Sequence, residues 1–237
     1  MNTNWAEKCV ALVPCFNEAD SISGVLTEIL RFVSKVIVVD DGSTDDTAAQ
    51  ARKAGAFVVP HTRRFGKGAA LTTGVLAAVE LGFEWALTLD GDGQHSPSDI
   101  PKFFSFAEQH GADLVVGNRM PCACAMPPVR RLTNLTMSWM ISHRMGQSLP
   151  DTQCGFRLFR LEAWRHVEIR ARHFEVESEM LVGFLKAGFR VGFVPVKVIY
   201  GLGGSKIRPL ADSWRWLKWW FRGSRTSGKR GKISSCD

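Results

Sequence analysis

The sequence of 237 residues lacks several features that would place it in a common class of protein. It contains no apolar run of about 18 residues, the length that a helix needs to cross a bilayer, so any membrane contact is expected to be peripheral. Residues 1–9 show no basic stretch followed by an apolar one, which argues against a secretory signal. These absences predict a cytoplasmic protein.

Cysteine frameworks and the usual nucleotide-binding motifs are also missing. The six cysteines form no CxxC pair, and their spacing fits neither a zinc ribbon nor a disulfide framework. Cys122 and Cys124 are close together without a ligand cluster beside them, so reduced thiols are expected. No GxGxxG follows the first predicted strand and no GxxxxGK(S/T) segment occurs, which disfavours a dinucleotide oxidoreductase and a P-loop enzyme.

The composition is that of a globular protein with a basic surface. A hydrophobic fraction of 45% and a charged fraction of 22% allow a sizeable core. The formal net charge of +7 favours an anionic partner. Nucleic acid, phospholipid and phosphorylated substrates all qualify, and charge alone does not rank them.

The first half of the chain alternates short β-branched runs with helix-like stretches. Buried strands are predicted at Cys9–Pro14, Lys35–Asp40, Ala56–Val59, Trp85–Asp90 and Asp113–Gly117. Helices are predicted at Ala19–Val33, Asp45–Ala54, Gly68–Leu81 and Pro97–His110. This alternation predicts an α/β fold with a mostly parallel central sheet and helices on both faces.

The second half of the chain is less regular. It is expected to contain helices at Val129–Met145 and Glu175–Ala187, and strands at Phe156–Phe159 and Val191–Val196. A last helix, rich in tryptophan, is expected at about residues 210–222. The remaining residues 223–237 are rich in Gly, Ser, Lys and Arg and are predicted to be a basic, disordered tail behind a single domain.

Three polar clusters follow predicted strands, at residues 14–18, 40–45 and 90–95. Ligands of open α/β sheets bind beyond the carboxyl ends of the strands, so these clusters are expected to form one site. A turn or a helix cap explains a single acidic strand end, but three on separate strands favour a binding function. Asn17 and Glu18 suit a base or ribose, Phe16 offers a face for stacking, and an acid after the second strand suits a ribose hydroxyl.

The spacing of Asp90, Asp92 and Gln94 suggests a metal site. Alternate residues of an extended segment point the same way, so these three side chains are expected to converge. Their oxygens are hard donors, which suit Mg²⁺ or Mn²⁺, and such a metal commonly holds a substrate diphosphate. The alternative is a solvated Asp-Gly turn. Lys67 is interpreted either as a phosphate ligand or as a solvated loop lysine.

The segments PCFNE, VVDDGSTDDT, GKGAAL, LDGDGQH, GNR and DTQCGFRLF occur in this order. Together they resemble the family 2 glycosyltransferases of GT-A fold, and within them the dolichyl-phosphate mannose synthase and dolichyl-phosphate glucosyltransferase branch. The resemblance covers roughly residues 9–206. It implies one GT-A catalytic domain over residues 1–222. It also implies inverting transfer of a hexose from a donor such as GDP-mannose or UDP-glucose to a polyprenyl-type lipid phosphate, with Mg²⁺ or Mn²⁺.

The resemblance also implies roles for individual residues of this sequence. The nucleotide-sugar subsite would comprise Pro14, Phe16, Asn17, Glu18, Asp40, Asp41, Lys67 and Asp90. The metal would be held by Asp90, Asp92 and Gln94. Residues near the acceptor phosphate would be Arg119, Arg130, Arg131, Arg157 and Ser205. The catalytic set would be Asp92, Arg119, Arg131 and Lys206.

Two features depart from the family's pattern. Mannose synthases usually carry a larger residue than Gly91 between the two aspartates, which leaves the donor sugar open. Some members end in transmembrane helices, whereas this sequence has a segment, Trp214–Phe221, with four tryptophans and flanking cations. Such a segment is typical of an interfacial helix and places the protein on the cytoplasmic face of a membrane; the alternative is a helix that packs on the core. Nucleic-acid binding is disfavoured because no recognised motif accompanies the basic tail.

Two other functions remain open. A lipid phosphate is already an anion and needs no base, whereas a hydroxyl acceptor would require a carboxylate base. Glu175, Glu177 and Glu179 could supply one, or they could form a solvated helix start. A transferase acting on a saccharide or another hydroxyl acceptor is therefore one alternative, and a non-catalytic nucleotide-sugar-binding protein is another.

Overall fold

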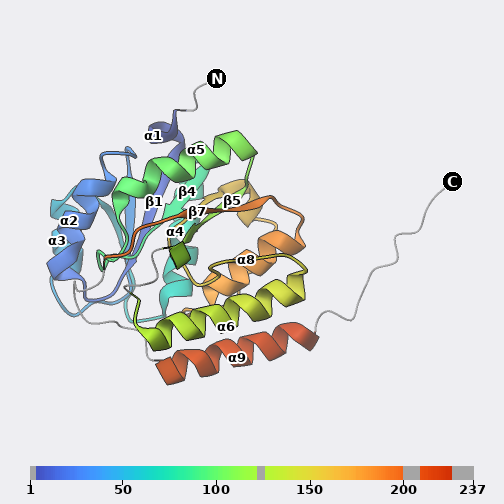
Figure 1. Cartoon of the computed structure of the whole chain (residues 1–237). Helices are drawn as coiled ribbons and strands as arrows, with labels where there is room; N and C mark the ends of the chain where they lie inside the picture. Colours follow the sequence, from blue (N-terminus) through green and yellow to red (C-terminus); the bar gives the residue numbers. More distant parts are fainter. Residues whose placement is uncertain (1–3, 122–125, 200–208, 226–237) are drawn as a thin grey trace. The chain divides into compact units, whose positions relative to one another are not determined.

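The computed structural model describes residues 4–121, 126–199 and 209–225 (Figure 1). The chain forms two compact units, residues 1–204 and 205–237. Ser205 and Lys206, together with the expected tail from residue 226 onward, lie outside the described residues.

The first unit is built on a seven-stranded sheet in the order β3-β2-β1-β4-β6-β5-β7. The strands are β1 Cys9–Cys15, β2 Val36–Asp40, β3 Phe57–Pro60, β4 Trp85–Thr88, β5 Leu114–Asn118, β6 Arg157–Arg160 and β7 Val191–Pro195. β6 runs antiparallel to β4 and β5, and every other pair is parallel. The expected mostly parallel sheet is confirmed.

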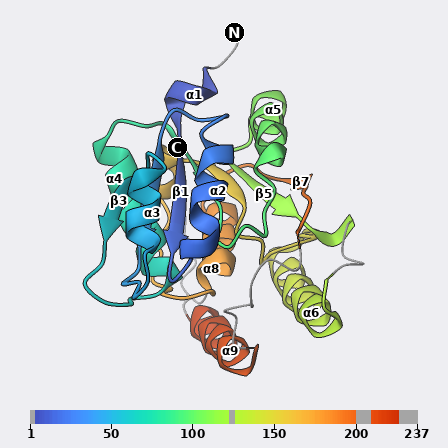
Figure 2. The same ribbon diagram turned by 90° about the vertical axis from the view of Figure 1, so that its left-hand side faces the viewer.

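Helices flank the sheet on both faces (Figures 1 and 2). They are α1 Trp5–Lys8, α2 Ala19–Ile29, α3 Thr47–Lys53, α4 Lys67–Glu80, α5 Ile100–His110, α6 Pro128–Met145, α7 Leu161–Trp164 and α8 Val176–Lys186, with a 3-10 turn at Pro97–Asp99. α4 packs on β1 and β2, α5 on β5 and β7, and α8 contacts β7 and α6.

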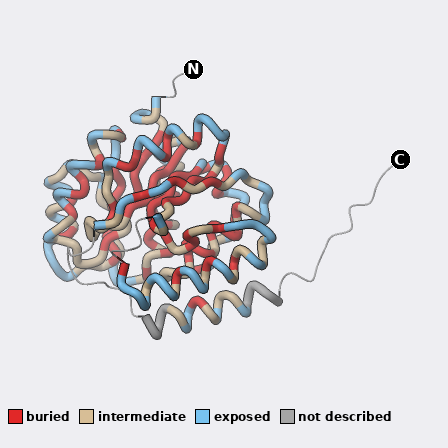
Figure 3. The backbone as a smooth tube through the Cα atoms, viewed as in Figure 1, coloured by how far each residue is buried: buried red, intermediate tan, exposed pale blue. Residues whose placement is uncertain are grey.

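The core follows from the continuous apolar runs of the central strands. All five residues of β2 and nearly all of β1 are buried, as expected for parallel strands covered on both faces (Figure 3). Residues from β4, β5 and β6 extend this core across the sheet. The carboxyl ends of β1, β2 and β4 therefore lie together at one edge of a well-packed sheet.

Several boundaries differ from those expected from the sequence. α3 begins at Thr47 instead of Asp45, because the Asp45 carboxylate accepts hydrogen bonds from the Thr47 amide at 3.0 Å and from the Ala19 amide at 3.2 Å. β4 ends at Thr88, so Asp90 lies in the following turn rather than in the strand. That turn changes the geometry of the predicted metal site.

The second unit contains α9, Pro209–Arg225. This helix extends beyond the expected end at residue 222. Its tryptophan rings cluster, with the centroids of Trp216 and Trp220 5.5 Å apart, while Trp214 and Phe221 are more than half exposed. Within the described ranges of both units, no helix has the length and apolarity required to cross a membrane.

Candidate active site

The loops after β1, β2 and β4 are joined by direct hydrogen bonds. The Asn17 amide donates to Ser43 Oγ at 2.9 Å, and the Asn17 side chain accepts from the Thr44 amide at 2.8 Å. Ser21 Oγ donates to the carbonyl of Gly91 at 2.7 Å, which connects the first loop to the third. The structure therefore brings the three expected polar clusters together.

The first loop is held in an uncommon backbone conformation. Asn17 has φ of 53°, and it is the only residue other than glycine with positive φ in the described part of the chain. Asparagine tolerates the left-handed region because its side chain bonds locally, here to Thr44. Next to it, the guanidinium of Arg64 lies 4.1 Å from the centroid of the Phe16 ring. A base that stacks on Phe16 would meet this cation.

Asp41 was expected to contact the nucleotide, but in the structure its carboxylate binds the loop before α4. Its carboxylate is buried and accepts from the amides of Phe65 at 2.8 Å and Gly66 at 2.7 Å, and it contacts His61 Nδ1 at 2.8 Å. Asp40 accepts from the Ser43 amide at 3.1 Å. These partners use most of the capacity of the Asp41 carboxylate. Its position indicates a role in holding the loop that leads into α4.

Gly66 is required at the end of this loop. It has φ of 106°, and a Cβ at this position would lie 2.3 Å from the carbonyl oxygen of Arg172. The Gly68 amide donates to the same carbonyl at 2.8 Å. Only glycine fits both the conformation and the contact. The segment before α8 is thereby fixed against the start of α4.

Lys67 opens α4 and bridges two carboxylates. Its Nζ lies 2.5 Å from Asp90 Oδ1 and 2.7 Å from Glu177 Oε1. Burial disfavours the charged amine, but the two carboxylates outweigh burial and raise the pKa of Lys67 above its ordinary value. Burial would raise the pKa of Asp90, yet Lys67 and His95 hold that pKa well below its usual range. The interpretation of Lys67 as a solvated loop lysine is therefore wrong.

Glu177 is a residue of the site that the sequence only partly indicated. Its side chain is buried beside Lys67, which excludes a solvated helix start for this residue. Its second oxygen, Oε2, and His95 Nδ1 are the two buried side-chain atoms without a hydrogen-bond partner among the described residues. Glu179 instead accepts from the amides of Arg170 at 2.8 Å and Ala171 at 2.7 Å. The sequence feature that could have indicated the burial of Glu177 is its position next to the apolar residues of the segment FEVESEML.

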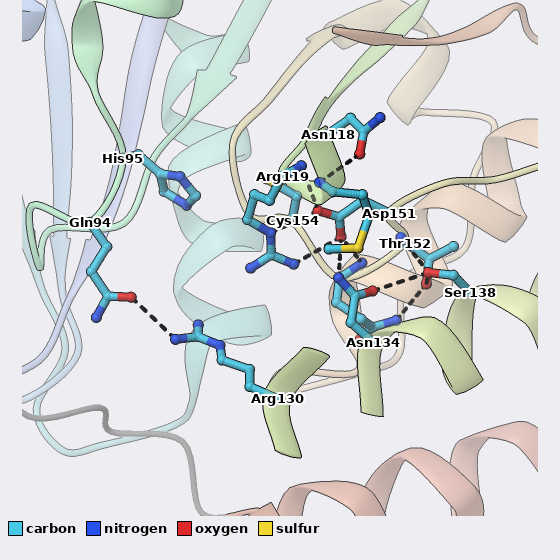
Figure 4. Close-up of polar contacts among 12 residues, drawn as sticks. Gln94, His95, Asn118, Arg119, Arg130, Asn134, Ser138, Asp151, Thr152 and Cys154 are labelled. Atoms are coloured by element: carbon cyan, nitrogen blue, oxygen red, sulfur yellow. Dashed lines mark hydrogen bonds and ion pairs between the residues drawn. The ribbon is translucent and has the colours of Figure 1, made fainter. Parts of the chain in front are cut away.

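The loop of Asp90, Asp92 and Gln94 is a turn, not the extended segment on which the predicted convergence of alternate side chains was based. Asp92 Oδ1 accepts from the Gln94 amide at 3.0 Å, and Gln94 Oε1 accepts from Arg130 Nη1 at 3.3 Å (Figure 4). Gln94 therefore contacts α6 instead of joining the carboxylates.

The two carboxylates of this turn nevertheless fit a divalent cation. Burial and the neighbouring charge of Asp90 raise the pKa of Asp92, and a cation bound beside the two carboxylates would oppose both effects. Within the described ranges, no three His, Cys, Asp or Glu side chains are grouped as a metal cage. Mg²⁺ typically takes one or two carboxylates and completes its shell with substrate phosphates and water. Asp90 and Asp92 match that pattern.

Arg119 belongs to a buried polar cluster at the end of β5 (Figure 4). Its Nε and Nη2 donate to Asp151 at 2.7 and 2.8 Å, and its amide donates to the same carboxylate at 3.0 Å. Asn134 of α6 also donates to Asp151, at 2.9 Å. Burial would raise the pKa of Asp151, but Arg119 and these hydrogen bonds lower it. The cluster attaches α6 to the sheet.

Arg157 does not fit its expected place beside the acceptor. It is 1% exposed, and its guanidinium donates to the carbonyls of Cys154 at 2.8 Å, Glu177 at 2.6 Å and Thr152 at 3.0 Å. Burial lowers the pKa of Arg157, although Glu177 opposes this effect. The residue is enclosed because β6 is an interior strand of the sheet. Its position indicates that it holds the loop before β6 against α8.

The remaining expected arginines lie at the start of α6. Arg130 is half-buried beside Gln94, whereas Arg131 is exposed.

Among the expected nucleotide-sugar residues, Pro14 lies in β1, one residue before Cys15, which is opposite Asp40 of β2. The site thus presents acidic residues on the β4 side and arginines on the α6 side.

This fold and site define a nucleotide-sugar transferase, and comparison with known proteins identifies the family. The glycosyl transferase family 2 model matches residues 10–167. The chain is 30% identical over 219 residues to a UDP-N-acetylglucosamine–dolichyl-phosphate N-acetylglucosaminyltransferase of Methanococcus voltae, covering 82% of this chain and 87% of the relative. It is 28% identical over 214 residues to an undecaprenyl-phosphate mannosyltransferase of Micrococcus luteus, covering 84% and 87%. The chain belongs to glycosyl transferase family 2.

Solved structures agree on the fold. The chain superposes on a glucosyl-3-phosphoglycerate synthase of Mycobacterium tuberculosis, crystallised with Mn²⁺, UDP-glucose and phosphoglyceric acid, with a TM-score of 0.72. The two are 20% identical, and the match covers 96% of this chain and 83% of the synthase. The GT-A fold expected from the motifs is confirmed.

Proposed function

We propose that the protein catalyses inverting transfer of a hexose from a nucleotide-diphosphate sugar to a polyprenyl-type lipid phosphate. The observation that carries this proposal is the contact between Arg130 and Gln94, which brings a basic helix to the acidic turn after β4. A cation at this place suits an acceptor that is itself an anion. Relatives that are named for transfer to dolichyl phosphate and undecaprenyl phosphate support the same acceptor class.

The proposed mechanism relies on positioning and electrostatics. Asp90 and Asp92 would hold Mg²⁺ or Mn²⁺, and the bound metal would neutralise charge on the diphosphate leaving group. Lys67 fixes Asp90 by the ion pair at 2.5 Å, and Glu177 holds Lys67 from the other side. The residues proposed to contact the nucleotide are Pro14, Phe16, Asn17, Glu18 and Asp40. The acceptor phosphate attacks without a base, and Lys206 is proposed to assist the leaving group.

Arg130 and Arg131 are proposed to orient the acceptor phosphate. Arg119 then supports them indirectly, because its ion pair with Asp151 also engages Asn134 of the same helix. Ser205 is proposed as a further phosphate contact. α9 is proposed to bind the cytoplasmic face of a membrane through Trp214 and Phe221, the exposed aromatic residues of this helix.

A hydroxyl acceptor is the second candidate, and one observation favours it. Glu177 Oε2 is buried beside the site and has no hydrogen-bond partner in residues 4–121, 126–199 and 209–225, so it could accept a proton from an incoming hydroxyl. The structurally similar synthase was crystallised with phosphoglyceric acid, a small acceptor. A non-catalytic sugar-nucleotide binder is the third candidate and would bind donor without transferring the sugar.

The acceptor class can be tested directly. With radiolabelled donor sugars and membranes that contain polyprenyl phosphate, we expect label in a butanol-extractable product that is released by mild acid. The lability arises because the sugar is joined through an anomeric phosphate. Label in a water-soluble product that is stable to mild acid would instead support the hydroxyl acceptor. Donor binding without transfer to either class would support the non-catalytic protein.

Replacement of Arg130 or Arg131 by alanine is expected to affect the acceptor selectively. A charge-assisted phosphate contact of this kind corresponds to about tenfold or more in kcat/KM for the acceptor, with donor Kd unchanged. Steady-state kinetics with a short, water-soluble prenyl phosphate would measure this. Arg144→Ala, in the last turn of the same helix, is the matched control. Equal weakening of donor binding would move the two arginines to the nucleotide side.

A further inference from the structure

α6 differs from an ordinary surface helix because it buries polar side chains and exposes large apolar ones. The side that packs on the protein carries Asn134 and Ser138, which are 4% exposed and take part in the cluster around Asp151 (Figure 4). Ser138 Oγ also lies 3.1 Å from Thr152 Oγ1. Helices of water-exposed proteins normally bury their apolar side. Ile141 is buried on the same side, so hydrogen bonds and this apolar side chain attach the helix, while four large apolar residues lie on the outer side.

The outer face of α6 presents a row of large apolar side chains. Val129, Leu132, Leu135 and Trp139 are 69%, 67%, 44% and 68% exposed, respectively. At about 100° per residue these four positions fall on one side of the helix, opposite Asn134 and Ser138. Four of the ten large apolar side chains that are exposed in the described part of the chain lie on this helix. Such a row marks an interaction surface rather than scattered exposure. We call it the α6 apolar row.

The charge of α6 indicates what covers the α6 apolar row. The helix PVRRLTNLTMSWMISHRM contains three arginines and no acidic residue. Two copies of this helix would repel each other, which argues against self-association through the row. Tryptophan on an apolar face combined with arginines is typical of a helix that lies in the headgroup region of a membrane. The ring of His143 stacks on Trp139 at 6.0 Å and adds no negative charge.

The α6 apolar row is also connected to the site. Arg130 is adjacent to Val129, the first residue of the row, and donates to Gln94 of the acidic turn. The helix is rigidly attached through Asn134 and Asp151, so the position of the row fixes the position of Arg130. A bilayer that covers the row would therefore contact the same helix that carries the arginines proposed to hold the acceptor phosphate.

We infer that α6 is a membrane-binding helix of the catalytic unit, with an anionic lipid bilayer covering the α6 apolar row. This contact rests on the proposed function only for the identity of the acceptor that the bilayer carries, because vesicle binding requires no sugar transfer.

The test is co-sedimentation of the full chain with phosphatidylcholine vesicles that contain roughly one third phosphatidylglycerol. We expect the double variant Leu132→Ser/Trp139→Ser to lower the vesicle partition coefficient by about tenfold or more at both low and high salt, because apolar burial is not screened. Arg131→Gln should lower the partition coefficient at low salt only. The matched control is Phe57→Ser/Leu76→Ser, which removes two apolar side chains of 48% and 60% exposure on β3 and α4.

Three results would overturn the inference. The first is unchanged vesicle binding by Leu132→Ser/Trp139→Ser, and the second is an equal loss in the control variant. The third is a change of oligomeric state in sedimentation velocity, which would assign the row to a second copy of the chain. Thermal unfolding of each variant, together with a second variant, Val129→Ser/Leu132→Ser, distinguishes loss of binding from loss of folding. If the variant loses vesicle binding as expected but the wild-type protein glycosylates no lipid, only the proposed function fails.

Discussion

Asp92→Ala is expected to reduce sugar transfer by about a thousandfold or more while the protein stays folded. Asp92 lies in a turn, where its one described hydrogen bond accepts from the Gln94 amide two residues on. The negative charges of Asp90 and Asp92 repel each other, so removing the Asp92 carboxylate relieves this repulsion in the metal-free protein. We therefore expect the midpoint of thermal unfolding to stay the same or to rise slightly.

The measurement for Asp92 combines turnover with metal dependence. Wild-type protein should bind donor more tightly, and unfold at a higher temperature, when Mn²⁺ is added. Asp92→Ala and the isosteric Asp92→Asn should show neither response. Asp20→Ala, on the exposed face of α2, serves as the control. Turnover near the wild-type level in EDTA-treated buffer would show that Asp92 does not hold a metal.

Asp151→Asn is expected to cost about 3–5 kcal/mol of unfolding free energy at neutral pH, because it leaves the buried Arg119 without its counter-charge. Asp151 is completely buried and accepts five hydrogen bonds, three of them from Arg119. The exposed pair of Glu162 and Arg165 is the matched control, and Glu162→Gln should cost less than about 1 kcal/mol. Urea unfolding of the three proteins would measure this difference.

The pH dependence gives a second readout of the same pair. The folded-state pKa of Asp151 is lowered, so its stabilising contribution is complete above the unfolded pKa of about 3.9 and is lost as pH falls through the folded pKa. The difference in stability between wild type and Asp151→Asn should therefore shrink in acid. A difference that is constant from neutral pH to strong acid would indicate a packing effect instead of an ionic one.

The sequence predicted the site through the polar residues at its strand ends. Asn17, Asp40 and Asp90 follow β-branched runs, and parallel strands bring their carboxyl ends to one edge of the sheet. That argument needs only the order of local elements. It is confirmed for the fold, and the location of the site stays a prediction that the hydrogen-bonded loops support.

The errors arose where long-range packing decides the role of a side chain. Arg157 and Lys67 are basic residues within recognised motifs, and their sequence gives no sign that one is enclosed by carbonyls and the other by two carboxylates. Glu177 reaches Lys67 because the first turn of α8 lies close to the first turn of α4. The antiparallel direction of β6 was equally hidden, because short apolar strands look alike in either direction.

The attachment of α6 has a consequence for how the rate should depend on acceptor. Because α6 is attached to the catalytic unit, a helix lying flat on a bilayer keeps Arg130 within about one helix diameter of the lipid headgroups. An enzyme held at this height meets its acceptor by lateral diffusion. Its velocity should follow the mole fraction of polyprenyl phosphate within the vesicle surface, and diluting the acceptor with inert phospholipid at constant total acceptor should slow the reaction.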